Sequence, residues 1–295
     1  MDQPNSWIRL SSPELNVEIN PLGAQLSILR DQDGHDLLWD GDPAVWSGRA
    51  PLLFPIVGEL AGGSYRLDGR TYKLSRHGFA RGKMFEVVAP TAAAATFNLR
   101  ANEATLQLYP FNFELNIRYA LQGPTLVVTT SVHNRGTATM PASFGYHPGL
   151  RWPLPYGRAR AEHFIEFANE EPAPIRRLNS VGLLTDEPHP TPIVARRLGL
   201  NDSLFQNDVV IFDQVRSRCV TYGAQAGPRI RMSYPDSPYL GVWTKPGAGF
   251  ICIEPWHGIA DPAGFAGEFT EKPGVFAVPP GGVRQIEMSL TLLRG

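Results

Sequence analysis

The sequence predicts an all-β protein, a large antiparallel β-sandwich with few short helices. Two observations carry this prediction. Apolar and polar residues alternate with a period of two along several segments, as expected for strands that bury one face. The 29 glycines and 27 prolines are spread along the whole chain of 295 residues, which is typical of many short strands joined by turns. No stretch of a dozen residues combines a helical apolar stripe with caps.

The expected strands follow one another from end to end of the chain. The clearest are residues 113–122 and 285–292, where every second residue is apolar. Asp68-Gly69 lies between residues 64–67 and 70–74, and this dipeptide accepts the positive φ values of a tight hairpin turn. The other expected strands are residues 15–19, 25–30, 96–100, 125–133, 209–212, 229–233 and 249–253.

A single domain covering residues 1–295 is expected. Sandwiches of this length occur as one unit, and no shift in composition marks a boundary. The 43% of hydrophobic residues suffice for a substantial core. Residues 172–192 contain five prolines and are expected to form a long, irregular surface connection, to which the sequence assigns no role.

Charge and terminal sequence argue against two classes of partner. The 27 Lys and Arg against 28 Asp and Glu give a net charge of -1, which predicts no general attraction to nucleic acid or to an anionic membrane. The arginine pairs at 176–177 and 196–197 are expected to be solvated loop charges. No secretory signal and no apolar run of ~18 residues is present. Cys219 and Cys252 lie in apolar runs, which predicts buried free thiols and a cytoplasmic location.

Three short segments each place one proton-transfer group among aromatic, glycine and proline residues. These groups are His77 in residues 76–81, His147 in residues 145–148 and Glu254 in residues 253–256. Two imidazoles and a carboxylate can add one proton to a molecule while removing another. The sequence has no phosphate-binding loop, nucleophile elbow or metal-ligand spacing, so we expect acid-base chemistry without nucleophile, metal or cofactor.

Each of the two central candidates also has a structural interpretation. Pro148 holds His147 in extended backbone and so displays its ring at a strand end, although a histidine hydrogen-bonded in a turn would give the same pattern. Glu254 follows an apolar run and precedes Pro255, so we expect it to be buried with a pKa that its neighbours adjust. A structural ion pair is the alternative for Glu254.

Three further residues are candidates for ligand binding. Arg49 lies in an apolar, proline-bounded run and must find an acceptor, either a sugar hydroxyl or a carboxylate such as Glu59. Asp208 precedes an apolar strand and by itself indicates a turn. Trp256 offers an aromatic face on which a pyranose ring can pack, although tryptophans are core residues at least as often.

Taken together, these segments resemble the aldose 1-epimerase (galactose mutarotase) superfamily, and most of all its branch associated with lactose operons. The resemblance covers nearly the whole chain, in order. The residues that carry the resemblance are Arg49, which precedes a Leu-Phe-Pro sequence, and residues 76–80, 141–148, 241–246 and 252–256. It implies a galactose mutarotase-like β-supersandwich that needs no cofactor and has its active site in a groove on one face.

The resemblance also implies roles for individual residues. Glu254 would remove the proton from the anomeric O1 hydroxyl, and His147 would protonate the ring oxygen. His77 and Arg49 would bind sugar hydroxyls, and Asp208 falls where the family places a substrate-binding aspartate.

Two departures from the family pattern lead to further expectations. Gly149-Leu150 stands where the family commonly has an aromatic pair, so we expect a more open pocket wall at this point. His257 is expected at the rim of the groove.

The expected function is therefore an aldose 1-epimerase, an isomerase that acts on a free hexose such as galactose or glucose. A hexose 6-phosphate mutarotase is an alternative in which Arg76 and Arg81 bind the phosphate. A non-catalytic carbohydrate-binding or regulatory module of the same fold is the third, but it would need neither His147 nor Glu254. We expect a small-molecule sugar as partner and a monomer or weak homodimer; the sequence does not indicate which sugar is bound.

Overall fold

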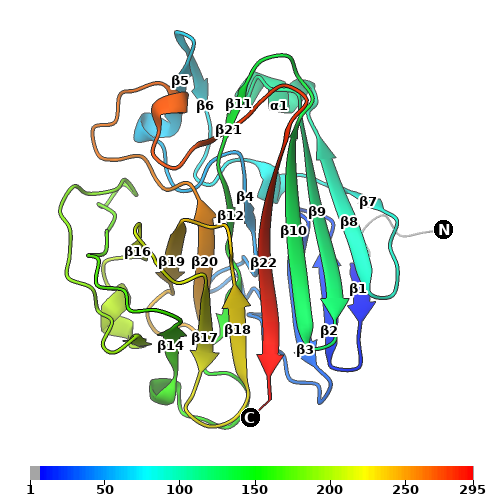
Figure 1. The fold of residues 1–295 in the computed structure, drawn as a ribbon, viewed down its shortest axis with the longest axis vertical. Coiled ribbons are helices and arrows are strands. Elements are labelled where there is room, and N and C mark those ends of the chain that lie inside the picture. The colour runs from blue at the N-terminus through cyan, green and yellow to red at the C-terminus, as the bar shows by residue number, and fades with distance from the viewer. Residues whose placement is uncertain (1–6, 295) are drawn as a thin grey trace.

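The computed structural model describes residues 7–294, and its named strands pair in antiparallel fashion throughout. Two large sheets lie against each other, which confirms the predicted all-β sandwich (Figure 1). Among the described residues there is one α-helix, the short α1 (Glu103–Leu108). Short 3-10 turns occupy Ala61–Gly63, Ala80–Gly82, Arg160–Glu162, Asp202–Phe205 and Phe269–Glu271.

The larger sheet has nine strands, and its long central strands are those that the sequence predicted most clearly. β10 buries every second residue along its whole length, because one face packs on the core and the other faces solvent. In sheet order the strands are β15 (Arg197–Gly199), β14 (Phe164–Phe167), β17 (Cys219–Gly223), β18 (Arg229–Ser233), β22 (Val283–Leu293), β10 (Thr125–Asn134), β9 (Phe113–Gln122), β8 (Ala94–Arg100) and β7 (Glu86–Val88).

The smaller sheet is centred on β20 (Phe250–His257) and carries the candidate site. Its strands run in the order β16 (Val210–Phe212), β19 (Tyr239–Trp243), β20, β12 (Phe144–Tyr146) and β4 (Leu52–Leu53), with β13 (Gly149–Arg151) also paired to β20. The sequence predicted that this strand ends at residue 253, and that was wrong. β20 continues through Pro255, which pairs with Leu240, and all eight of its residues are buried.

Three small sheets complete the fold. They are β1 (Ile8–Ser11), β2 (Leu15–Asn20) and β3 (Gln25–Asp31); the hairpin of β5 (Ser64–Leu67) and β6 (Arg70–Lys73); and the pair β11 (Met140–Ala142) and β21 (Phe276–Val278). Asp68 and Gly69 have φ values of 49° and 74°, so the predicted tight turn between β5 and β6 is confirmed.

The two faces of the smaller sheet have different partners. Side chains alternate between the faces of a strand, so Ile251 and Ile253 of β20 enter the main core together with Val128 and Leu290 of the nine-stranded sheet. Cys252 and Trp256, on the opposite face, belong to two smaller apolar clusters. Pocket and core are therefore the two sides of the same strand.

Residues 172–192 contain no named strand or helix, as the sequence predicted, but they are more than a surface connection. Ile175 and Leu184 are buried, and Leu184 packs with Val209, Ile211 and Trp256 on the outer face of the smaller sheet. This segment therefore covers the sheet next to the candidate site.

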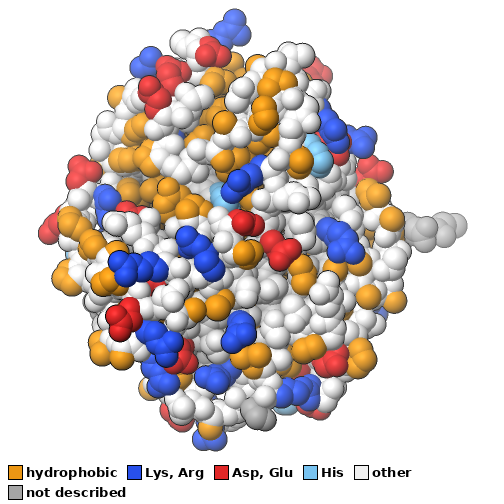
Figure 2. Space-filling view, viewed as in Figure 1, with side chains coloured by type: hydrophobic (Ala, Val, Ile, Leu, Met, Phe, Trp, Pro, Cys, Tyr) orange, Lys and Arg blue, Asp and Glu red, His pale blue; other side chains and the backbone are white. Residues whose placement is uncertain are grey.

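The surface agrees with the nearly balanced charge of the sequence. Figure 2 shows basic and acidic side chains intermixed over this face, without a large area of one sign. Among the described residues, no helix has the length and apolar character that a membrane span requires. Both cysteines are free; Cys252 is buried and Cys219 is half-buried.

The hydroxyl of Tyr146 joins the two large sheets just before His147. Tyr146 lies on β12 of the smaller sheet and is fully buried. Its Oη is 2.8 Å from Thr130 Oγ1 and donates toward the carbonyl oxygens of Val128 and Ile286, at 3.1 and 3.0 Å, on the nine-stranded sheet. This junction fixes the strand end from which His147 projects.

We therefore expect Tyr146→Phe to lower the free energy of unfolding by about 1–3 kcal/mol, because buried acceptors lose their donor. Urea denaturation followed by tryptophan fluorescence measures the change. Tyr72→Phe is the matched control, since its half-exposed hydroxyl makes no side-chain hydrogen bond within the described residues. Equal stability of the two variants would contradict the role given to Tyr146.

Candidate active site

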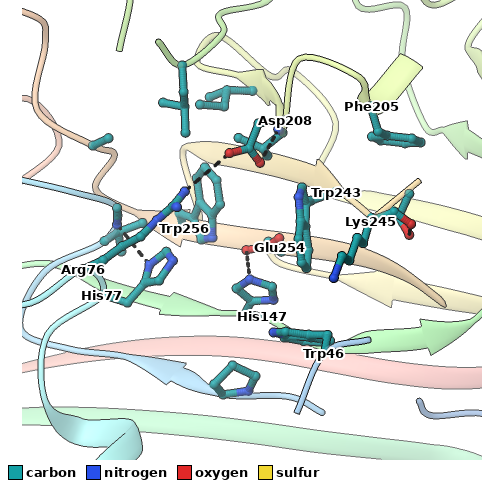
Figure 3. A pocket seen from close by; sticks show the side chains of 18 of the residues that line it. Trp46, Arg76, His77, His147, Phe205, Asp208, Trp243, Lys245, Glu254 and Trp256 are labelled. Carbon is teal, nitrogen blue, oxygen red and sulfur yellow. Dashed lines mark hydrogen bonds and ion pairs between the residues drawn. The ribbon is translucent and has the colours of Figure 1, made fainter. Parts of the chain in front are cut away.

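A cavity of about 390 Å³ opens on the outer face of the smaller sheet. Five of the six residues that the sequence singled out line it: His77, His147, Asp208, Glu254 and Trp256. They come from four separate segments of the chain, and Figure 3 shows their side chains converging on one space. The sixth residue, Arg49, is not among the lining residues.

Glu254 and Trp256 project into the cavity from alternate positions of β20. Two glycines on the neighbouring strands make room for the Trp256 ring. Gly145 lies opposite Trp256 on β12, where a Cβ would come within 2.7 Å of the indole, and a Cβ at Gly241 of β19 would overlap the same ring. Small residues on both flanking strands therefore let the indole lie flat against the sheet beside Glu254.

His147 lies directly against Glu254, with Nε2 3.3 Å from the carboxylate Oε2 (Figure 3). The ring is held by aromatic neighbours. It stacks on Trp46 with a centroid distance of 5.2 Å and meets Trp243 edge to face at 5.8 Å. The predicted display of His147 at the end of a strand is confirmed, because β12 ends at Tyr146 and β13 begins at Gly149.

Burial sets the protonation of this pair. Desolvation lowers the pKa of His147 to about 3, and it raises the pKa of Glu254 well above its ordinary value. Trp256 and Arg76 oppose the rise at Glu254, while Asp208 adds to it. Burial thus favours the uncharged form of both groups, in which the carboxyl proton of Glu254 lies beside the imidazole.

His77 is fixed in one orientation by the backbone. Its φ of 68° is unusual for a residue other than glycine, and its Nδ1 accepts the backbone N–H of Gly58 at 3.1 Å. Burial is the largest cause that keeps the pKa of His77 well below its ordinary value, and a positive charge on His147 would lower it further, so the ring of His77 is neutral. In a neutral imidazole whose Nδ1 accepts, the proton is on Nε2, which makes His77 a hydrogen-bond donor to a ligand.

Asp208 lies at the edge of the cavity, as the sequence allowed, in a turn with φ of 62°. Its Oδ2 is 3.7 Å from Arg76, and its Oδ1 accepts the N–H of Val209. Arg177 supports this turn by donating to the carbonyl oxygens of Leu204, Asp208 and Val209. The expectation that residues 176–177 are solvated charges is thus wrong, because free carbonyls of the turn offer Arg177 buried acceptors.

Arg49 is not among the residues that line the cavity, so its contact with a substrate stays a prediction. Its Nη1 donates to the carbonyl of Ser27 at 2.7 Å, and its guanidinium lies 5.2 Å from the centre of the Trp7 ring. In the structure the acceptor of this half-buried arginine is therefore a backbone carbonyl rather than the carboxylate of Glu59. Other cations line the cavity instead: Arg76, Arg81 and Lys245.

The expected open wall is filled by a residue that the sequence did not single out. Gly149 leaves space that Trp46 occupies, and a Cβ at Gly149 would lie 2.8 Å from the Trp46 ring. The loop residue Trp46 thus supplies an aromatic wall at the point where the sequence has Gly149-Leu150 instead of an aromatic pair. No local signal in the sequence distinguishes Trp46, because the loop that carries it has no periodicity.

His257 is not at the rim of the groove. It is buried on the face of β20 opposite Trp256 and meets Phe276 edge to face, because consecutive residues of a strand point to opposite sides.

Comparisons with known proteins agree with this arrangement. The sequence model of the family described as aldose 1-epimerase matches residues 6–276. The chromosomal protein LacX of Lactococcus lactis subsp. lactis is 33% identical over 297 residues, covering 97% of this chain and 99% of that protein. The structure of a galactose mutarotase related enzyme from Lactobacillus acidophilus superposes with a TM-score of 0.90 at 30% identity, covering 98% and 97% of the two chains. A galactose mutarotase-like protein from Lactobacillus casei gives the same TM-score at 28% identity, covering 98% and 100%.

The protonation of His147 can be measured directly. Because its pKa is lowered, the ring gains a proton only as the pH falls toward about 3. At about pH 5, where an ordinary histidine of pKa about 6.5 is mostly charged, we expect His147 to remain neutral. Nitrogen NMR of labelled imidazoles detects this, with His147→Asn identifying the signal. A His147 signal that titrates near the ordinary value would refute the assignment.

Proposed function

Since this chain belongs to the aldose 1-epimerase family, we propose that it interconverts the α and β anomers of a free hexose such as galactose or glucose. The observation that carries this proposal is the 3.3 Å contact between His147 and Glu254, buried at the base of a cavity of about 390 Å³. A carboxyl group and an imidazole that share one proton can act as base and acid in the same step. The two free cysteines fit the cytoplasmic location that belongs to this proposal.

The reaction begins with a proton transfer inside the pair. Glu254 passes its carboxyl proton to His147 when the polar sugar enters, because the hydroxyl groups stabilise the resulting ion pair. The carboxylate then removes the proton from O1 of the sugar, and the imidazolium delivers its proton to the ring oxygen O5. The C1–O5 bond breaks as the C1–O1 bond becomes a carbonyl.

The open aldehyde then rotates about the bond between C1 and C2 and presents either face to O5. Ring closure reverses the proton movements: His147 accepts the proton of the O5 hydroxyl, and Glu254 returns a proton to O1. Ring closure therefore leaves the pair as imidazolium and carboxylate, and His147 returns its proton to Glu254 as the sugar leaves, which restores the neutral starting pair. No net proton is gained or lost, which a reaction that runs in both directions requires.

The remaining cavity residues bind the sugar in this scheme. His77 donates its Nε2–H to a sugar oxygen, and Asp208 accepts from a hydroxyl group at the cavity mouth. Trp256 and Trp243 present aromatic surfaces to the C–H groups of the ring. A small neutral molecule with many hydroxyl groups satisfies both kinds of contact.

Removing either proton-transfer group should abolish most of the activity. We expect Glu254→Gln and His147→Asn each to slow the approach of α-glucose or α-galactose to anomeric equilibrium by at least about a hundredfold, since general acid-base groups contribute about 10²–10⁴-fold. Polarimetry of freshly dissolved sugar measures the rate.

Glu86→Gln and His133→Asn are the matched controls, because both residues lie on the nine-stranded sheet and outside the cavity. If the two cavity variants equilibrate the sugars as fast as wild type, the acid-base mechanism is wrong. If wild-type protein binds sugar without accelerating mutarotation, the chain is instead a non-catalytic carbohydrate-binding module.

The cations of the cavity favour a second candidate, a hexose 6-phosphate as substrate. Arg76 and Arg81 line one side of the cavity and Lys245 lines another. All three are already engaged within the protein: Arg76 with Asp208, Arg81 with the carbonyl of Arg76, and Lys245 with the carbonyl of Val45. A phosphate would have to compete with these contacts, which is why we rank a free hexose first.

The two substrates can be separated in one assay. We expect kcat/KM for galactose or glucose to exceed that for glucose 6-phosphate by at least about tenfold, the equivalent of about 1.4 kcal/mol. Arg81→Gln should leave the rate with free sugars within a few-fold. A preference for glucose 6-phosphate that Arg81→Gln removes would establish the second candidate instead.

A further inference from the structure

Cys252 lies beneath the proton-transfer pair and takes no part in the proposed reaction. It occupies β20 two residues before Glu254, so both side chains project from the same face of the strand. Cys252 is fully buried, and its thiol makes no hydrogen bond to another described residue. The thiol packs among Trp39, Ala248 and Phe250, behind the two cavity residues His147 and Glu254.

Three different ligand types meet at this point. One nitrogen of His147, the Sγ of Cys252 and one carboxylate oxygen of Glu254 all lie within 4.8 Å of one another. In a tetrahedral zinc site such atoms are roughly 3.3–3.8 Å apart, so movements of about an ångström would bring them around a common ion. Imidazole nitrogen, thiolate sulfur and carboxylate oxygen are each ligand atoms that zinc accepts, and three protein ligands leave the fourth position to water.

The charge of the complex also suits this location. A divalent cation with one thiolate, one carboxylate and a neutral imidazole carries no net charge. Trp46, Trp243 and Phe250 surround the cluster, and a neutral complex avoids the desolvation cost of a charge in such an apolar setting.

A second cluster of residues that can bind metals differs from this one, because its carboxylate oxygens already accept hydrogen bonds. Asp31, Asp33 and His35 also lie within 4.8 Å of one another. There both oxygens of Asp31 already accept hydrogen bonds, from the backbone of Asp33 and His35 and from the Tyr156 hydroxyl. That cluster is a closed turn, whereas His147 and Glu254 face the open cavity.

We propose that His147, Cys252 and Glu254 form an inhibitory site for a thiophilic divalent cation such as Zn²⁺. On binding, the thiol and the carboxyl group release their protons to solvent, and the imidazole donates its lone pair to the metal. The cation then occupies both groups that move protons. Binding itself does not depend on the function proposed above; only the inhibition rests on it.

The inhibition predicts a defined pattern in the mutarotation assay. Zinc chloride should slow wild-type protein and should be reversed by a chelator, and rising sugar concentration should weaken its effect because both ligands need the same groups. Cys252→Ala, and Cys252→Ser as a variant of similar size, should keep the basal rate. Each should need at least about tenfold more zinc for half-inhibition, since losing one ligand sharply weakens binding.

Cys219→Ala is the matched control, because this second free thiol lies on β17 of the nine-stranded sheet. It should remain as sensitive to zinc as wild type. Equal sensitivity of Cys252→Ala and wild type would overturn the site, and so would wild-type protein that zinc leaves fully active.

Cobalt binding provides a readout that is independent of catalysis. Co²⁺ added to wild-type protein should give a thiolate-to-metal absorption band in the near ultraviolet, which zinc displaces and which Cys252→Ala lacks. A band in a protein without mutarotase activity would support the site while refuting the proposed function. Absence of the band in an active protein would refute the site alone.

Discussion

The burial of β20 on both faces is the constraint on which the rest of the structure depends. β19, β12 and β13 pair with it along its length, so its backbone is satisfied and its direction is fixed. Because side chains alternate, Ile251 and Ile253 hold the core while Glu254 faces the cavity. A shift of one residue in the register of this strand would put the carboxyl group into the core, so the core itself specifies that Glu254 faces the cavity.

The same burial determines the chemistry. Removing Glu254 and His147 from water disfavours their charged forms, and a neutral pair with one transferable proton results. Such a pair can exchange the roles of acid and base, because His147 Nε2 and Glu254 Oε2 are only 3.3 Å apart and a proton can pass between them. The proposed zinc complex, also neutral overall, depends on the same desolvated surroundings.

Long-range contacts shape the cavity around this pair. Arg177, from the irregular residues 172–192, supports the turn that carries Asp208. Trp46, from another loop, fills the space left by Gly149 and stacks on His147. Loops therefore supply part of the cavity wall, while Glu254 lies on β20 and His147 lies in the short link between β12 and β13. In the proposed function this arrangement holds the proton-transfer pair next to the sheet, while the walls that would select a substrate come from segments that can change without disturbing the core.

The sequence by itself determined the fold class and singled out most of the candidate residues that line the cavity. Period-two alternation is a local property of strands, so β9, β10 and β22 could be predicted, and five of the six candidates chosen from their segments line the same cavity. Only the tertiary structure decided the rest. It joined Arg49 to the carbonyl of Ser27, placed Trp46 in the cavity wall and brought His147 close to Cys252. Contacts between residues far apart in the chain depend on sheet order and side-chain packing, which leave no local pattern to read.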